Sequence, residues 1–297
     1  MFYLNLVDHQ YFKNDTELTS VTQILKKYEQ DFDKEFWLLH TSVKTLLPGP
    51  DFIAYASQYK GKIPEDKLQE IIKLYNITPE ELAQTRQYLE NKWAETKNKG
   101  LASGSTFDIL SKKRSIQRGH ETCFINGLAY EVRECTSINP GKIISTIEDY
   151  NNIPPGAYPD FMIYNEQLKL AGTMDWMFMN PDRSFYVNDL KRNKNFSRNS
   201  GMQTYKSPIH RFKKNEYNYA YLQVLLYAYL LTQFGYTCKS TWILNHNHKG
   251  YTTAIHPYKA DIIEELIDHY AEKTLGITKK KTSIVFDELD GEDLYQL

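Results

Sequence analysis

The chain has 297 residues, of which 41% are hydrophobic and 14% aromatic, so it can bury a substantial core and is not a disordered tail. Its formal net charge is −1, so the overall charge does not indicate a nucleic-acid partner. Binding to a nucleic acid would require a local basic patch. Three widely spaced cysteines, Cys123, Cys135 and Cys238, exclude a disulfide framework, a CxxC metal site and the four thiolates of an iron–sulfur cluster.

The N-terminal sequence and the hydropathy of the chain bear on membranes. Residues 1–8 have no basic start followed by an apolar run of signal-peptide length. No segment approaches the ~20 apolar residues that cross a bilayer. We therefore expect an intracellular, cytoplasmic protein with no membrane partner.

The first hundred residues carry helix signals after a short extended start. Ser20 and Gln23 have the spacing of a capping box, and Thr78-Pro79 puts proline at the first position of another helix. Farther along the chain, residues 101–118 predict a helix with a basic face, and Asp108 lies in it. The expected organisation is a mostly helical region over residues 1–100, a core over 101–276 and an acidic tail over 277–297.

A first strand of a central sheet is predicted over residues 158–164, with Asp160 in it. Two apolar, β-prone runs follow, residues 168–179 and 185–191, and the turn-forming segment 180–184 separates them. This pattern predicts a hairpin. Side chains alternate along a strand, so Asp189 and Lys191 share a face, and one register brings Asp175 beside Asp189.

Two neighbouring carboxylates resist ionising together unless a cation lies between them, and oxygen ligands favour Mg²⁺ or Mn²⁺. A lysine two residues beyond Asp189 can orient or activate an attacking water. Asp175, Asp189 and Lys191 therefore indicate a metal-dependent nuclease site. The competing interpretation is a charged strand end whose side chains are simply solvated, because an acid two positions before a lysine also occurs at residues 65–67 and 90–92.

The segment from Lys191 to Asn215 contains eight Lys and Arg residues and no Asp or Glu. Phe196, Tyr205 and Phe212 are interleaved with them, a mixture suited to phosphate contacts with some base stacking. A solvated basic loop is the alternative. We expect DNA contacts here from Lys191, Arg192, Lys194, Arg198, Lys206, His210, Arg211, Lys213 and Lys214.

An apolar and aromatic helix is predicted over residues 217–234, ending at Gly235. Gln223 and Tyr227 project from one face of it. They could be packing residues, but a buried glutamine needs a hydrogen-bonding partner, which an active-site edge would supply. A strand pair at 241–244 and 251–255 and a helix over 258–275 complete the core.

The order Asp175, then Asp189-Leu190-Lys191, then a helix with Gln223 and Tyr227 resembles the PD-(D/E)XK nuclease superfamily, specifically its RecB-like exonuclease branch and phage-encoded members. Weaker likenesses at residues 20–22 and 207–210 extend the resemblance over most of 15–275. It implies an α/β fold, restriction-endonuclease-like, with a mixed central β-sheet flanked by helices and a mostly helical N-terminal region.

The resemblance also implies roles for individual residues. Asp175 and Asp189 would be metal ligands, joined by the Leu190 carbonyl, and Lys191 would position the water nucleophile. Gln223 and Tyr227 would orient the active site or the DNA strand. The family's helical histidine is replaced here by Asp108, which leaves the remaining ligand open between Asp108 and Asp160.

We expect a deoxyribonuclease that hydrolyses phosphodiester bonds with Mg²⁺ or Mn²⁺ and no iron–sulfur cluster. The resemblance favours an exonuclease of DNA recombination, repair or processing, with DNA as partner and a recombination or replication protein as a further one. The alternatives are a catalytically silent DNA-binding module of the same fold, an endonuclease, and a protein that uses the hairpin only structurally.

Overall fold

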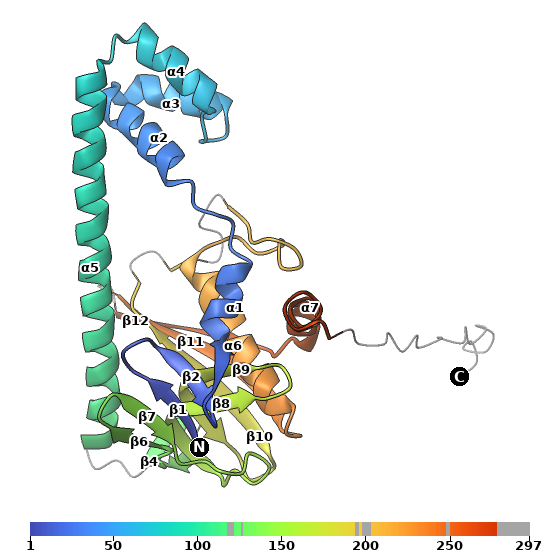
Figure 1. The fold of residues 1–297 in the computed structure, drawn as a ribbon. Coiled ribbons are helices and arrows are strands. Elements are labelled where there is room, and N and C mark those ends of the chain that lie inside the picture. The colour runs from blue at the N-terminus through green and yellow to red at the C-terminus, as the bar shows by residue number, and fades with distance from the viewer. Residues whose placement is uncertain (118–121, 126, 194–195, 198–202, 248–249, 278–297) are drawn as a thin grey trace, which may run out of the picture.

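The structure is a computed structural model that describes residues 1–117, 122–125, 127–193, 196–197, 203–247 and 250–277, without the side chains of 100–117 and 123–125. It is a mixed α/β structure in which helices flank a large central sheet (Figure 1). The coarse fold class expected from the sequence is therefore confirmed. No helix within the described ranges is both long and apolar enough to cross a membrane.

Ten strands form the central sheet in the order β12-β11-β10-β9-β3-β2-β1-β7-β6, and β8 pairs with β9 off this path. The strands are β1 (Phe2–Asn5), β2 (Gln10–Lys13), β3 (Thr16–Ser20), β6 (Thr136–Asn139), β7 (Lys142–Ser145), β8 (Gly156–Asn165), β9 (Leu170–Met179), β10 (Ser184–Lys191), β11 (Thr237–Asn247) and β12 (Gly250–His256). A separate pair, β4 (Thr122–Ile125) and β5 (Leu128–Glu131), lies beside it.

The predicted hairpin is present as β9 and β10, which pair antiparallel. Its turn is closed by Asp182, whose carboxylate accepts hydrogen bonds from the backbone amide and hydroxyl of Ser184. Arg183 has a φ of 62°, a conformation that tight turns require. Beyond the hairpin, β10 pairs with β11 in parallel, which needs a crossover connection, and α6 (Glu216–Thr232) supplies it.

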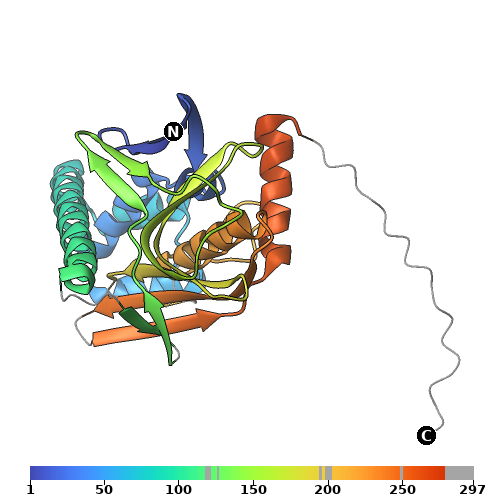
Figure 2. The same cartoon turned by 90° about the horizontal axis from the view of Figure 1, so that it is seen from below.

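The main core lies between the sheet and α6. Thirteen residues of α6 are buried, because the helix packs against β8 to β11 on one side and is covered by α1 (Val21–Lys27) and α7 (Ala260–Tyr270). A short π-helix, η1 (Ala271–Leu275), continues α7. Figure 2 shows α6 against the curved strands, with α5 and α7 on opposite sides of the sheet. The capping box expected at Ser20 and Gln23 is present at the start of α1.

A second group of helices lies away from the sheet, at one end of the long helix α5 (Figure 1). We call α2 (Lys34–Leu46), α3 (Gly49–Gln58), α4 (Glu65–Leu74) and the first turns of α5 (Pro79–Gln117) the helical lobe. It has its own hydrophobic cluster, which includes Phe52, Ile63 and Leu68. Ion pairs Lys34–Glu90 and Arg86–Glu35 link α2 to α5.

The boundary expected at residue 100 does not coincide with a break in the structure. α5 is a single helix of 39 residues that runs through it, and the helix predicted over 101–118 is its second half. The extended start of the chain also belongs with the core, because β3 pairs with β9 in parallel at Ser20 and Ala171. The lobe is therefore an insertion between α1 and β4.

Candidate active site

The candidate site lies where β9 and β10 diverge. The last pair of their ladder is Asn188 with Trp176, and one step further the register sets Asp189 opposite Asp175. Beyond this point the backbone ladder between β9 and β10 ends. A side chain replaces it there, because Oδ2 of Asp175 accepts a hydrogen bond of 2.6 Å from the Leu190 amide. The register that the sequence needed to bring the two carboxylates together is thus the observed one.

Lys191 lies against Asp189 in this fork. Its Nζ is 2.7 Å from Oδ2 and 3.0 Å from Oδ1 of Asp189, and the Asp189 side chain is buried. Burial by itself lowers the pKa of Lys191, but the charges of Asp189 and Asp175 and the hydrogen bond to Asp189 outweigh it, so the pKa is raised. Lys191 is therefore a fixed ammonium group beside two carboxylates.

Gln223 and Tyr227 extend this arrangement from β10 to α6. The Lys191 ammonium donates to Oε1 of Gln223 at 3.3 Å, and Nε2 of Gln223 donates to the Tyr227 hydroxyl at 2.8 Å. Burial raises the pKa of Tyr227 well above its usual value, so its hydroxyl stays neutral. Gln223 is buried with both ends of its amide hydrogen-bonded, and it therefore fixes Lys191 relative to α6.

A close approach of backbone to ring holds Tyr227 in place. A Cβ added at Gly172 of β9 would lie 2.4 Å from Cε1 of Tyr227, which is far inside van der Waals contact. Only glycine leaves room for the ring at this position. The glycine that precedes Thr173 and Asp175 in the sequence thus has a packing role next to the site.

Two residues near the fork come from distant parts of the chain. Asp160 on β8 falls opposite Asp175 in the β8–β9 register and has a φ of 52°, which interrupts the ladder there. Tyr11 on β2 is hydrogen-bonded to Thr173 across 2.9 Å. Burial raises the pKa of Tyr11 and outweighs the lowering by the Thr173 hydrogen bond, with the charges of Asp160 and Asp175 adding to the rise.

Tyr11 was missed by the sequence reasoning. It reaches the site only because the hairpin of β2 and β3 attaches to β9. The two residues at the hairpin tip, Asn14 and Asp15, both have positive φ, as two-residue hairpin loops require. That Asn-Asp pair could have predicted the hairpin, but no local pattern predicts where it docks.

The chemistry of the fork fits a hard cation. Asp175 and Asp189 offer carboxylate oxygens, the ligand type that Mg²⁺ and Mn²⁺ prefer, and Oδ2 of Asp175 accepts from the Leu190 amide. Asp160 falls opposite Asp175 in the β8–β9 register, but the three carboxylates do not converge closely enough to form one ligand group. Within the described part of the chain, no group of three or more His, Cys, Asp or Glu side chains is already gathered closely enough to hold a metal ion. The side chain of Asp108 lies outside the described residues, although its backbone belongs to α5.

The segment from Lys191 to Asn215 offers less free positive charge in the structure than its sequence indicates. Several of its cations are paired with acids from elsewhere in the chain, namely Lys206 with Asp31 at 3.6 Å, Lys214 with Glu29 at 2.9 Å and Arg211 with Glu265 at 3.2 Å. Arg192, His210 and Lys213 are exposed, whereas Lys194 and Arg198 lie outside the described residues. The positive charge available to a phosphate backbone is therefore smaller than the count of basic residues indicates.

The aromatic residues of the same segment are largely unavailable for base stacking. Tyr205 and Phe212 are buried in the main core, and Phe196 packs against Tyr217 with ring centroids 5.0 Å apart. The expectation that these rings stack on bases is wrong for Tyr205 and Phe212. Their alternation with charges reflects a loop anchored to α6 by its apolar side chains.

Comparisons with known proteins give little support to any one family. No family model matches the chain, and no curated protein matches it. A solved structure described as "Crystal structure of SSO0001" aligns at 11% identity and a TM-score of 0.25, over 82% of this chain and 86% of that one. A TM-score of 0.25 is too low to indicate a shared fold. The class of the protein, mixed α/β, therefore follows from its own architecture.

Proposed function

We propose that the protein is a metal-dependent nuclease that hydrolyses DNA phosphodiester bonds, with a restriction-endonuclease-like core. The observation that supports this most directly is the fork between the central strands β9 and β10, which brings Asp175, Asp189 and Lys191 into one region of the sheet. A buried ion pair costs stability unless its geometry is good. Ionisable groups with shifted pKa values also gather at functional sites, so a buried pair of this kind supports a functional role. The fork is the place in the described structure where such a cluster connects two strands and a helix.

The residues of the fork have separable tasks in this proposal. Lys191 is held protonated and aimed by Gln223, so it can orient a water molecule and offset negative charge as it develops on the phosphate. Asp175 and Asp189 present oxygens to a divalent cation, and the third ligand stays open between Asp108 and Asp160, which falls opposite Asp175 in the β8–β9 register. A bound Mg²⁺ or Mn²⁺ would supply a lowered pKa for water and charge stabilisation of the phosphate.

The proposal is tested with the purified full chain and end-labelled linear DNA in Mg²⁺, Mn²⁺ or EDTA, scoring binding and cleavage together. We expect cleavage with either metal and none in EDTA. Asp189→Asn should remove cleavage, whereas Asp15→Asn, an equal charge change at an exposed hairpin tip, should retain it. Binding without cleavage in any metal would indicate a catalytically silent DNA-binding module. Neither binding nor cleavage would reject a nucleic-acid function.

An exonuclease is the finer proposal. The resemblance of the order Asp175, Asp189-Leu190-Lys191, Gln223 and Tyr227 to the RecB-like branch supports it. Equal masses of closed circular and linearised plasmid should differ, with only the linear form degraded to short products. Rapid nicking of closed circles would favour an endonuclease and leave the metal ligands unchanged.

A further inference from the structure

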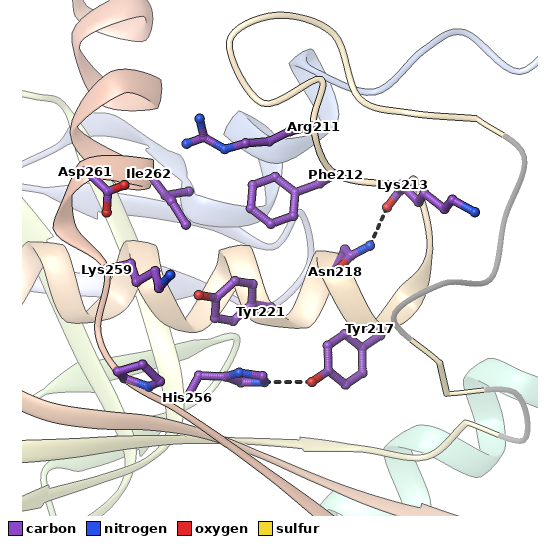
Figure 3. Close-up of a pocket in the computed structure, with 11 residues that line it drawn as sticks. Arg211, Phe212, Lys213, Tyr217, Asn218, Tyr221, His256, Lys259, Asp261 and Ile262 are labelled. Atoms are coloured by element: carbon purple, nitrogen blue, oxygen red, sulfur yellow. Dashed lines mark hydrogen bonds between the residues drawn. The ribbon is translucent and has the colours of Figure 1, made fainter.

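A cavity of about 940 Å³ lies outside the fork, between the first turns of α6, the segment 211–213 and the junction of β12 with α7 (Figure 3). We call it the α6–α7 pocket. Its volume is in the range of cavities that hold small ligands or cofactors. Tyr217 and Tyr221 line it from α6, roughly 120° around the helix from Gln223 and Tyr227. It is therefore a separate site from the fork, on a different face of the same helix.

Aromatic side chains form one wall of the pocket. The Tyr217 hydroxyl is hydrogen-bonded to Nε2 of His256 across 2.7 Å, and the rings of Tyr221 and His256 are 4.6 Å apart. Figure 3 shows these three rings together beneath the cavity, with Phe212 above them. The hydrogen bond fixes the orientation of Tyr217, so the wall offers flat, ordered π faces.

Positive charge surrounds this wall. Arg211, Lys213 and Lys259 line the pocket and Asp261 is its acidic residue, so the lining carries a net positive charge. Lys259 precedes α7, and its side chain extends toward Tyr221 (Figure 3). Arg211 is paired with Glu265 at 3.2 Å, and Lys259 is exposed at the rim of the pocket.

Cations beside ordered rings are the combination that single-stranded nucleic-acid sites use, with phosphate on the cation and base on the ring. We propose that the α6–α7 pocket binds one nucleotide unit of a DNA strand, with the base against Tyr217 and His256 and the phosphate at Lys259. The choice of a DNA strand rests on the proposed function, whereas nucleotide binding itself does not. Residues 211–213 line the pocket and precede α6, the helix that also carries Gln223 and Tyr227, so a strand could contact both sites.

Binding of deoxyadenosine monophosphate to the full chain in EDTA tests the pocket without cleavage. We expect the nucleotide to bind more tightly than deoxyadenosine or inorganic phosphate, because only it engages both ring and cation. Lys259→Glu should weaken its binding by at least about tenfold, the loss expected for one charge-assisted contact. Lys273→Glu is the matched control, since it makes the same charge change at the other end of the α7–η1 segment.

Two further experiments complete the test. One distinguishes binding in this pocket from binding in the fork, and the other distinguishes binding of a DNA strand from binding of a free nucleotide. Asp189→Asn should leave nucleotide binding unchanged, and a short oligodeoxyadenylate should compete with the nucleotide in wild type and lose that ability in Lys259→Glu. The proposal is overturned if Lys259→Glu binds like wild type, if phosphate alone binds as tightly, or if the oligomer does not compete. Intact nucleotide binding in a protein that cleaves no DNA would support the pocket and reject the nuclease.

Discussion

The sheet core and the helical lobe are two hydrophobic cores in one chain that differ in what they bury. The main core holds the ion pair of Asp189 and Lys191 and the amide of Gln223 at its edge. The lobe buries apolar side chains around a single histidine, His40, which packs among Phe36, Trp37 and Phe52. Burying charges costs stability unless they are well paired, so the main core keeps a costly buried ion pair that the described residues of the lobe do without.

The largest expected effect is on cleavage by Lys191→Ala. The variant removes the ammonium group that faces Asp189 and Gln223, a loss that acts on the transition state and should lower kcat by about 10² or more. Lys239→Ala is the control, because Lys239 lies on β11 beside Asp182 at the opposite end of the hairpin. Single-turnover rates on linear DNA measure both variants. If Lys191→Ala cleaved DNA at nearly the wild-type rate, the fork would have a structural role and no catalytic one.

Gly172→Ala should affect stability and activity together. The new methyl group would meet the Tyr227 ring, and overpacking of this kind costs about 1–3 kcal/mol in the free energy of unfolding. The displaced ring would also release Gln223, so cleavage should fall as well. Gly49→Ala in α3 is matched, because a Cβ there meets nothing within 4 Å. Urea unfolding and cleavage rates give the two readouts, and full activity in Gly172→Ala would mean that Tyr227 does not orient the site.

Ile63→Val should weaken the lobe alone. Ile63 is fully buried in the lobe cluster, and removing one methylene there costs about 0.5–1.5 kcal/mol. Because the lobe has its own core, the cleavage rate should not change. Hydrogen exchange can locate the effect in α2 to α4. A fall in protection of β9 and β10 to the same extent would show that the two cores unfold as one.

The smallest expected effect is a pH dependence confined to the lobe. Burial lowers the pKa of His40, with Lys44 and Lys62 lowering it further, so the folded lobe binds a proton less readily than the unfolded chain. Stability should therefore be complete above the ordinary histidine pKa of about 6.5 and decline as the pH falls below it. His40→Leu should remove the decline, as exchange rates of lobe amides at pH 7 and pH 5 can measure. Lys191, whose pKa is raised, stays protonated between pH 7 and pH 5, so its own charge causes no matching change over that range.

Local sequence patterns predicted the parts of the site that are close together in the chain. Alternating side chains and a turn segment identified β9 and β10 and set Asp175 beside Asp189, and four-residue spacing set Gln223 beside Tyr227. The contacts of Tyr11 and the acids that neutralise Lys206 and Lys214 were not predictable. They depend on pairings between segments far apart in the sequence, which no periodicity encodes.

The helical insertion also affects the order in which the chain folds. Tyr11 and Thr173 meet although they are 162 positions apart, because the whole lobe and α5 lie between β3 and β9. Closing so long a loop is slow while it is a flexible coil, whereas helices joined by short turns form early. A lobe that folds first would turn most of that loop into a rigid spacer and bring the two ends of the sheet within reach. Pulse-labelled hydrogen exchange should then show amides of α2 to α4 protected before those of β3.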